Sequence, residues 1–264
     1  MPKSEFRLPS RARPAIFLPM RHLLFCPSFF PFALLLLALS ATCLGGCVGG
    51  GAADPYSKRY TAADINPNPA ILNSAIVKGT NLSNLRLENV VIKDATFFNT
   101  TAQGAVFKNV VFDNCRFINA KFDRSVLENV RFRGGILTCE ADMHNVKRRT
   151  QFTNSRFTNL ILEGTYLENA VFNGSNSSIA LRNCLQVTAA DPIVTGANIH
   201  LVLEGSYFRR MTIAELTGAS TLTVTHCRLE HVSFGKSTFK NKLFSKNIVY
   251  GPSPYEDSKR SRRR

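Results

Sequence analysis

The sequence predicts an all-β fold in which the chain winds into a four-sided coil of twenty residues per turn. Three observations carry this prediction. An apolar residue, most often Phe or Leu, recurs at every fifth position over long stretches. A mostly small residue stands two positions before it, and Asn, Asp or Gly stands two positions after it. The three series keep one period, and the last of them does not depend on hydrophobicity.

A period of five fits neither an α-helix nor a flat strand. Five residues of a helix advance by about 500°, so successive apolar residues would line no single face. Side chains of a strand alternate between faces, so an odd spacing would turn every second apolar residue outward. The chain must therefore bend by a quarter turn between repeats. The apolar residues are Leu82, Leu87, Ile92, Phe97, Ala102, Phe107, Phe112, Phe117, Phe122, Leu127, Phe132 and Leu137, then Phe152, Phe157, Leu162, Leu167 and Phe172.

The bends have residues suited to them. Asn, Asp and Gly tolerate tight turns and positive φ better than other residues, and only Arg124 departs from these three types. The predicted turn residues are Asn84, Asn89, Asp94, Asn99, Gly104, Asn109, Asn114, Asn119, Arg124, Asn129 and Gly134, then Asn154, Asn159, Gly164, Asn169 and Gly174.

This pattern resembles the pentapeptide-repeat family, in which a small residue and a central Leu or Phe both point inward. The resemblance covers residues 80–174 well and 197–249 more loosely, and Asn stands here mainly at the fifth position instead of the second. It implies a right-handed quadrilateral parallel β-helix, that is, a pentapeptide-repeat solenoid. We expect this solenoid over residues 79–250.

Residues twenty positions apart should then stack about 4.8 Å apart in neighbouring parallel strands. Two outward columns alternate in charge, and a third should form an amide ladder at a corner. These columns are Glu88–Lys108–Glu128, Lys93–Asp113–Arg133 and Asn89–Asn109–Asn129.

The repeat is interrupted twice, near residues 140–151 and 175–198. We expect a loop or short helix outside the wall at the first interruption. In the second, the pairs Ile179/Leu181 and Ala197/Ile199 keep the inward spacing. The register resumes at Leu203, Phe208 and Ile213 and then shifts by one residue, which predicts a bulge or short loop. The shifted series is Val224, Leu229, Phe234, Phe239, Phe244 and Val249.

The beginning of the chain reads as an export signal. Basic residues precede an apolar run that is too short to cross a bilayer comfortably, and the run ends in Leu44-Gly45-Gly46-Cys47. The last four residues resemble the bacterial lipobox, which implies cleavage after residue 46 and acylation of Cys47. A single transmembrane helix is the alternative. Met20 would give a signal of more usual length, so it is a candidate for the true start.

We thus predict a signal peptide at 1–46, a flexible tether at 47–78, and a disordered basic tail at 251–264. Of the net charge of +15, residues 1–46 carry +4 and residues 259–264 carry +5, so most of it lies near the two ends and does not indicate nucleic-acid binding. By resemblance to lipoprotein sorting, Val48 after Cys47 favours the outer membrane. Expected partners are membrane lipid through the acylated Cys47 and an unknown protein, and a homodimer is left open.

No residue pattern indicates catalysis, a cofactor or a metal site. Cys115 and Cys227 occupy small inward positions, so we expect buried free thiols. His226 and His231 fall at corners and should be exposed turn residues. The first interruption also gathers Cys139, Glu140, Asp142 and His144, which match no known ligand spacing.

Three functions are compatible with these observations. The preferred one is a non-catalytic protein-interaction or structural scaffold held at the membrane in the cell envelope. The first alternative is a DNA-mimicking protein that interacts with topoisomerases, as some members of the resembled family do with acidic walls. The second is an uncharacterised enzyme that uses the 139–144 loop.

Overall fold

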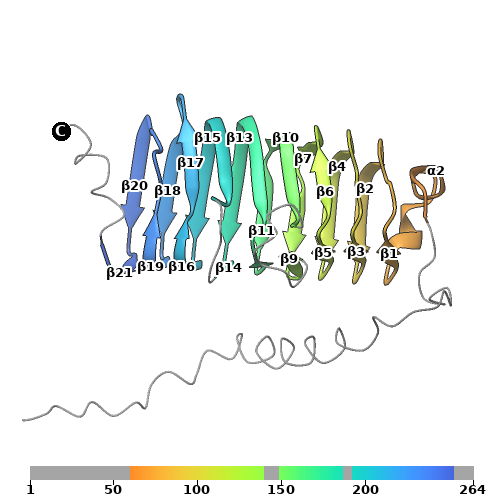
Figure 1. The fold of residues 1–264 in the computed structure, drawn as a ribbon, viewed down its shortest axis with the longest axis horizontal. Helices are drawn as coiled ribbons and strands as arrows, with labels where there is room; N and C mark the ends of the chain where they lie inside the picture. Colours follow the sequence, from red (N-terminus) through yellow and green to blue (C-terminus); the bar gives the residue numbers. More distant parts are fainter. Residues whose placement is uncertain (1–59, 140–148, 187–191, 253–264) are drawn as a thin grey trace, which may run out of the picture. The chain divides into compact units, whose positions relative to one another are not determined.

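The computed structural model describes residues 60–139, 149–186 and 192–252. All of these belong to the second of the chain's two units, Ala53–Arg264. They form a parallel β-solenoid of about eight turns, whose coils stack in sequence order (Figure 1). The predicted all-β coil is therefore confirmed. None of the helices in these three ranges is long and apolar enough to cross a membrane.

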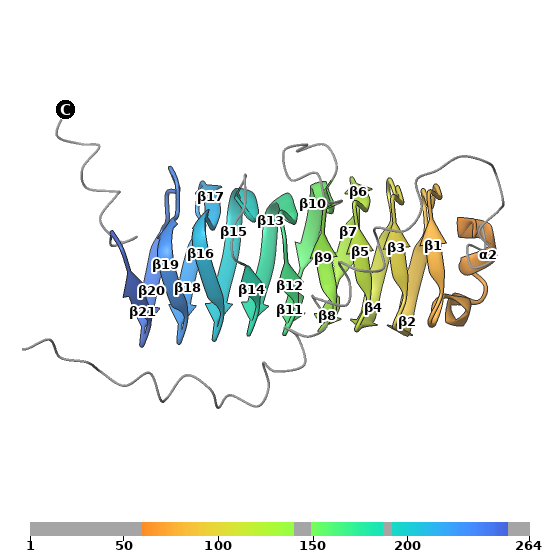
Figure 2. The ribbon, with the colours of Figure 1, turned by 60° about the horizontal axis from the view of Figure 1, so that its bottom comes forward.

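One side of the solenoid is a nine-stranded parallel sheet to which each coil gives one strand (Figure 2). Neighbours pair in register twenty residues apart in the first coils, as Phe97 with Phe117. The strands are β1 (Ile76–Lys78), β3 (Thr96–Phe98), β5 (Arg116–Ile118), β9 (Ile136–Thr138), β12 (Tyr166–Leu167), β14 (Leu185–Gln186), β16 (Tyr207–Thr212), β19 (Arg228–Ser233) and β21 (Ile248–Tyr250).

The remaining strands form a twelve-stranded sheet that bends around the corners. Its longer strands pair with two shorter ones, as β4 does with β7 and β8. The strands are β2 (Arg86–Lys93), β4 (Val106–Asp113), β6 (Lys121–Asp123), β7 (Val126–Glu128), β8 (Arg131–Arg133), β10 (Gln151–Thr158), β11 (Leu160–Glu163), β13 (Val171–Arg182), β15 (Val194–Glu204), β17 (Ala214–Thr217), β18 (Thr221–Thr225) and β20 (Asn241–Ser245).

The core is a set of inward ladders, one for each side of the coil. All the predicted central residues from Leu82 to Phe172 are buried. Phe rings stack face to face along a ladder, with centroids 4.7 Å apart for Phe97–Phe117 and 4.6 Å apart for Phe122–Phe152. Rings from different ladders meet edge to face, as Phe112 and Phe117 do. Both geometries suit the charge distribution of aromatic rings, so the Phe side chains pack favourably within and between the ladders.

The corners adopt the left-handed conformation that the sequence predicts. Every predicted turn residue except Gly174 has a positive φ, including Arg124 at 54°. His226 and His231 are likewise exposed corner residues with φ of 54° and 49°. The Arg124 side chain is exposed and lies 3.5 Å from the Asp123 carboxylate, and its backbone adopts the same left-handed conformation as the Asn residues of the other corners.

The predicted columns are also present and extend further than expected. Asn109 donates to Asn89 at 2.8 Å, Asn129 donates to Asn109 at 3.0 Å, and Asn159 continues the ladder to Asn129 at 3.1 Å. Arg133 binds Asp113 at 2.6 Å. Strand register continues this column of alternating charge as Lys93–Asp113–Arg133–Glu163–Arg182–Glu204.

The first interruption is an insertion that leaves the register intact. Across it, residues pair thirty positions apart, as Phe152 with Phe122, so the insertion adds ten residues to one coil. Cys139 and Arg149 form an antiparallel bridge at its base. Residues 140–148 lie outside the described residues. The later shift of one residue falls between Thr217 and Thr221, where pairing changes from twenty to twenty-one residues.

The second interruption corrects two expectations. Strands β13 and β15 run into it from either side and pair at a spacing of twenty-two residues. Gly174 is an inward residue without positive φ, and the corner lies instead at Asn176 with φ of 50°. Ala197 is not inward either, since it pairs with the exposed Ser175 and Thr217. Residues 187–191 lie outside the described residues.

The two ends of the solenoid differ. Helix α2 (Ala62–Ile65), which Thr61 caps, and the 3-10 helix η1 (Pro69–Leu72) precede β1 and bury Ile65 and Leu72. Ordered structure thus begins before the predicted boundary at residue 79. At the other end, the last inward residues Phe239, Phe244 and Val249 are only partly buried.

Candidate functional site

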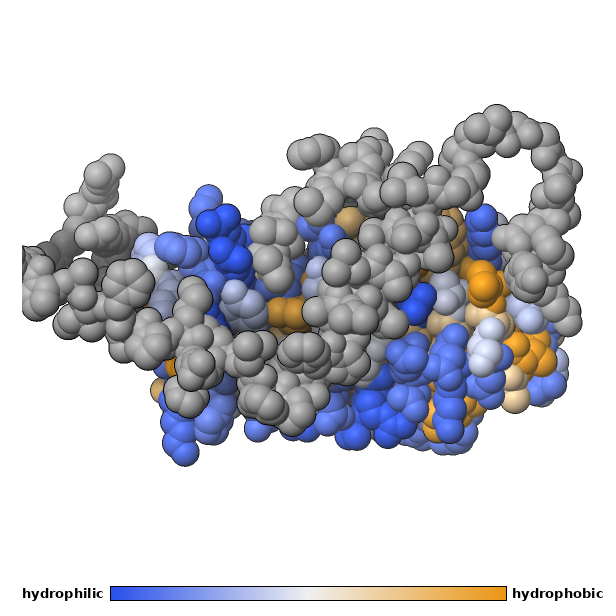
Figure 3. Space-filling view, turned by 90° about the horizontal axis from the view of Figure 1, so that it is seen from below, coloured by the Kyte–Doolittle hydropathy of each residue, from blue (hydrophilic) through white to orange (hydrophobic). Residues whose placement is uncertain are grey.

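The outer face of the nine-stranded sheet carries large apolar side chains in two adjacent columns. We call it the apolar wall and define it by Phe98, Ile118, Ile136, Tyr166, Leu185 and Tyr207, all of them half-buried. Phe98 and Ile118 are neighbours in one column, and the other four follow each other in the adjacent column. Figure 3 looks onto this side and shows hydrophobic side chains set among hydrophilic ones. Large apolar side chains that gather on an outer face can mark an interaction site.

A charged cluster fixes one end of the apolar wall. The Tyr207 hydroxyl donates to Glu230 at 2.8 Å, and Arg228 donates to the same carboxylate at 2.9 Å from Nε. The bond from Tyr207 and those from Arg228 hold the pKa of Glu230 below its ordinary value. The Arg228 guanidinium also lies 5.2 Å from the ring centroids of Tyr207 and Tyr250. This end therefore presents aromatic rings in fixed positions.

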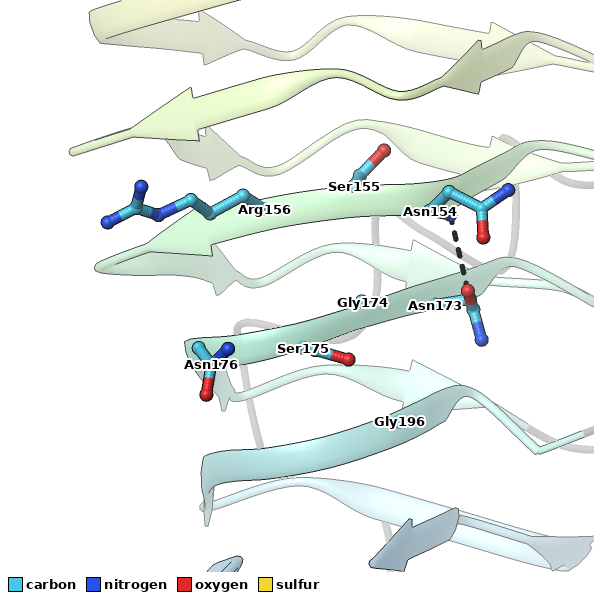
Figure 4. Close-up of a pocket in the computed structure, with 8 residues that line it drawn as sticks. All are labelled: Asn154, Ser155, Arg156, Asn173, Gly174, Ser175, Asn176 and Gly196. Carbon is cyan, nitrogen blue, oxygen red and sulfur yellow. Dashed lines mark hydrogen bonds between the residues drawn. The ribbon is translucent and has the colours of Figure 1, made fainter.

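A second feature is a hollow of about 580 Å³ on the twelve-stranded sheet, where β10, β13 and β15 run side by side (Figure 4). Two glycines of the hollow lie where neighbouring strands approach closely. A Cβ on Gly174 would stand 2.2 Å from the Ser155 carbonyl oxygen, and one on Gly196 would stand 1.6 Å from the Gly174 carbonyl oxygen. A larger residue at either position would therefore displace the adjacent strand.

The lining of the hollow is polar, and two of its asparagine side chains hydrogen-bond to neighbouring strands. Asn173 accepts from the Asn154 backbone at 3.2 Å and donates to Thr195 at 2.8 Å. Asn176 accepts from Asn198 at 3.0 Å. Figure 4 shows Arg156 at the margin of the hollow, pointing away from Asn154 and Asn173. The hollow has the shape to receive a partner's side chain, and its chemistry indicates no reaction.

The predicted lipidation residue Cys47 lies outside the described residues, as do Glu140, Asp142 and His144. Of the 139–144 cluster only Cys139 is described, and it is half-buried. In the described ranges, no group of three His, Cys, Asp or Glu side chains is placed to hold a metal ion.

The other cysteines in the described ranges, Cys115, Cys184 and Cys227, are buried free thiols, as expected for Cys115 and Cys227. Cys184 lies in the same inward column as Cys115 and Cys227, next to Ser206. Burial raises the pKa of Cys115 and of Cys184 to about 12, and it raises that of Cys227 as well. These thiols therefore stay protonated and unreactive at neutral pH.

Neither the apolar wall nor the hollow was predicted, although the first left a signal in the sequence. Once the twenty-residue coil is known, Phe98 and Ile118 fall one position after an inward residue, and Ile136 falls one before. These are outward positions, where a run of large apolar residues is unusual. The hollow left no such signal, because glycine also suits a turn.

Comparison with known proteins agrees with the fold. The family model of pentapeptide repeats matches residues 92–129, 103–138 and 149–176, with eight copies. No curated protein sequence matches significantly. A solved structure of QnrB1, a plasmid-mediated fluoroquinolone resistance protein, is 10% identical over 67% of this chain and 85% of its own, with a TM-score of 0.31. HetL from the cyanobacterium Nostoc, involved in heterocyst differentiation regulation, is 14% identical over 73% and 95%, with a TM-score of 0.23. Neither likeness transfers a function.

Proposed function

We propose that this pentapeptide-repeat protein is a non-catalytic interaction scaffold, held at the bacterial envelope by an acylated Cys47. The observation that carries the proposal is the apolar wall. Parallel strands fix its side chains in columns, and their backbone groups are already hydrogen-bonded within the sheet. A partner that covers this wall would remove apolar area from water without unpairing the backbone.

The anchor rests on the sequence. Residues 1–46 have the order of an export signal, and Leu44-Gly45-Gly46-Cys47 resembles a lipobox. Two or three acyl chains on Cys47 would suffice for stable attachment, and Val48 favours the outer membrane. Cys47→Ala should abolish labelling of the protein by radioactive palmitate. Unchanged labelling of this variant would exclude Cys47 as the anchor.

The DNA-mimicking alternative is less well supported by the charges. A mimic of DNA needs a strongly acidic wall, whereas the charged column from Lys93 to Glu204 alternates in sign. Catalysis has no positive support, and pentapeptide-repeat proteins are generally non-catalytic structural or interaction proteins.

The scaffold is tested by placing a photo-cross-linking amino acid at single outward positions in the cell. We expect Ile118 and Leu185 to capture the same protein partner. The matched control is Thr158, an exposed outward residue of β10 on the other sheet. Ile118→Glu with Leu185→Glu should abolish capture, since two carboxylates would have to be desolvated. Thr158→Glu should not.

Capture at Thr158 and not at Ile118 would contradict the role of the apolar wall. The enzymatic alternative has its own test. Substitution of Glu140 and His144 should leave partner capture and any cellular phenotype unchanged. A phenotype from these substitutions with intact capture would favour the enzyme.

A further inference from the structure

A column of charged side chains runs along the twelve-stranded sheet and alternates in sign from end to end. We call it the charged column and define it by Lys93, Asp113, Arg133, Glu163, Arg182 and Glu204, which strand pairing places in register. Neutral residues follow it at both ends, because Glu204 pairs with Thr225 and the Lys93 backbone N–H donates to the Asn73 side chain. The column is accessible to a partner, since Lys93, Arg133 and Glu204 are exposed.

The charged column is its own complement when it is reversed. If a second copy lies against this face with its coils in the opposite order, the first residue of one column meets the last of the other, and so on inward to the middle. Because the signs alternate and their number is even, every meeting joins opposite charges. Such a pairing has a two-fold axis and is closed. The facing pairs are Lys93 with Glu204, Asp113 with Arg182, and Arg133 with Glu163.

A second alternating column shows that this property is not a consequence of alternation alone. Glu88, Lys108 and Glu128 stand in register on the preceding side of the coil, and the neutral Thr158 follows them. With three members, that column has the same order of signs in both directions, so reversal sets like charges against each other. Alternation suits neighbours within one chain, whereas self-complementarity also needs an even number of charges.

An aliphatic column runs beside the charged column on the same strands. Its members precede the inward residues and the charged ones follow them, so both columns face outward. We define the aliphatic column by Val91, Val111, Arg131, Ile161, Ala180 and Val202. In the reversed arrangement its two ends, both valine, face each other, and Val111 faces Ala180. Arg131 faces Ile161, and because its guanidinium lies 3.7 Å from Glu163 of its own chain, its hydrocarbon stem is left against the isoleucine.

From these features we infer that two copies of the chain pair face to face through the charged and aliphatic columns, with their coils in opposite order. Sheets that pack in this way lie about 10 Å apart, which lets side chains of the facing columns meet. The contact spans six coils, or about 24 Å at about 4.8 Å per coil, so it is small and the dimer is weak. The inference goes beyond the proposed function, because capture of a partner by the apolar wall needs one copy alone.

The pairing places the two apolar walls on the same side of the dimer. In each copy the chain leaves the charged column, turns the corner at residues such as Asp94 and enters the nine-stranded sheet, as it does in β3. The two-fold axis is parallel to the strands, so this direction is the same in both copies. The dimer therefore presents two apolar walls side by side, a wider surface than one copy offers.

Charge disfavours other arrangements and other occupants of this face. A second copy with its coils in the same order would set each charge against an identical one or against the aliphatic column. Reversed copies displaced by one coil would set like charges against each other, and a displacement by two coils would leave charges at the ends without a partner. An anionic lipid surface would meet as many carboxylates as cations in the charged column.

The register of the dimer is tested without any change of charge. A photo-cross-linking amino acid replaces Val111 in the full chain in the cell, and cross-linked dimers are digested and mapped by mass spectrometry. We expect a covalent dimer whose cross-links fall in β13 of the other copy, at Ala180 and its neighbours. The matched control is Val126, a partly buried outward valine of β7 on the preceding side of the coil, which should yield at least about tenfold less dimer.

A second experiment exchanges every sign in the charged column. The exchanged chain keeps the alternation, so neighbours within it still attract, and two reversed copies of it still complement each other. It should therefore dimerise with itself to within about twofold of the original chain. Original and exchanged chains, produced together with different epitope tags, should form at least about tenfold fewer mixed dimers. The substitutions are Lys93→Glu, Asp113→Arg, Arg133→Glu, Glu163→Arg, Arg182→Glu and Glu204→Arg.

The mapped register decides the inference even if the exchanged chain does not fold. Absence of a dimer cross-linked from Val111 would refute it, and cross-links that return to Val111 itself would mean that the coils run in the same order. Mixed dimers as abundant as the two homodimers would show that the charged column does not set the pairing. Cross-linking of Val111 to a different protein in place of a dimer would assign this face to that partner. A missing dimer with capture at Ile118 intact refutes this inference alone and leaves the proposed function standing.

Discussion

Gln186 should destabilise the solenoid, and its replacement by Met should therefore stabilise the protein. It follows Leu185 in β14, occupies an inward position in register with Phe208, and is fully buried. Neither its Nε2 nor its Oε1 has a hydrogen-bond partner. A primary amide is thus held in an apolar ladder that is otherwise built of Leu, Phe and Val. Met has nearly the same length and shape and carries no group that needs a partner.

The magnitude follows from the burial. An unsatisfied buried polar group costs about 1–3 kcal/mol, so removal of the amide should gain about 2 kcal/mol. In a domain of this size that corresponds to a rise in Tm of roughly 4–8 °C. Solenoids do not always unfold in two states, so the midpoint of urea unfolding, followed by far-UV circular dichroism, is the comparison to make.

The matched control is Gln151→Met, because Gln151 occupies an outward position on the other sheet. Gln151→Met should change the free energy of unfolding by no more than about 0.5 kcal/mol, as is usual for surface substitutions. The reasoning is refuted if Gln186→Met lowers the midpoint or raises it no more than the control does. Either result would mean that the Gln186 amide is hydrogen-bonded in the folded protein.

Three further predictions concern the corners and the thiols. Arg124→Asn should raise the free energy of unfolding, measured by urea, by about 0.5–1 kcal/mol, because the corner needs a left-handed φ that Arg adopts at a cost. Gly135→Ala should destabilise by more than about 4 kcal/mol, since its Cβ would stand 2.1 Å from the Cys115 carbonyl oxygen, whereas Gly134→Ala meets open space and should cost about 1 kcal/mol; equal effects in thermal unfolding would contradict this. Stability should fall as pH rises from 9.0 towards about 12, because unfolded thiols lose their protons there while buried Cys115 and Cys184 keep theirs. Each thiol contributes a slope of about 1.4 kcal/mol per pH unit to the free energy of unfolding. The variant with both Cys115→Ala and Cys184→Ala should lose both contributions, which the urea midpoint measured against pH would show.

The regular part of the fold follows from the sequence because two kinds of constraint coincide there. Every fifth residue must be apolar to fill one interior, and every corner needs a residue that accepts positive φ. Four such repeats make one coil of twenty residues, which is why the ladder from Asn89 to Asn129 could be predicted with its register. Even Arg124 kept its place as a corner, since the residues before and after it left no other position for the bend.

The irregular part could not be predicted, because glycine satisfies two different requirements. Gly174 fits the turn series by spacing, yet the structure uses it where the ring of Phe157 and the Ser155 carbonyl leave no room for a Cβ. The corner then moves to Asn176, and the coil lengthens to twenty-two residues. Parallel pairing with β15 restores the register across this change. A five-residue period predicts only coils of twenty residues, whereas the length of this coil depends on pairing with the strand beside it. The sequence therefore predicted neither the buried Gln186 nor the hollow beside Gly174.

The ends of the solenoid separate what a repeat determines from what it leaves open. Each coil buries its inward residues only when another coil or a cap covers it, so the first and last coils need something that the repeat itself does not supply. At the first coil, α2 and η1 bury Leu72 against the core. At the last, Phe239, Phe244 and Val249 are only partly buried. The five-residue period therefore determines which residues point inward in every coil, but it does not determine what covers them at the two ends.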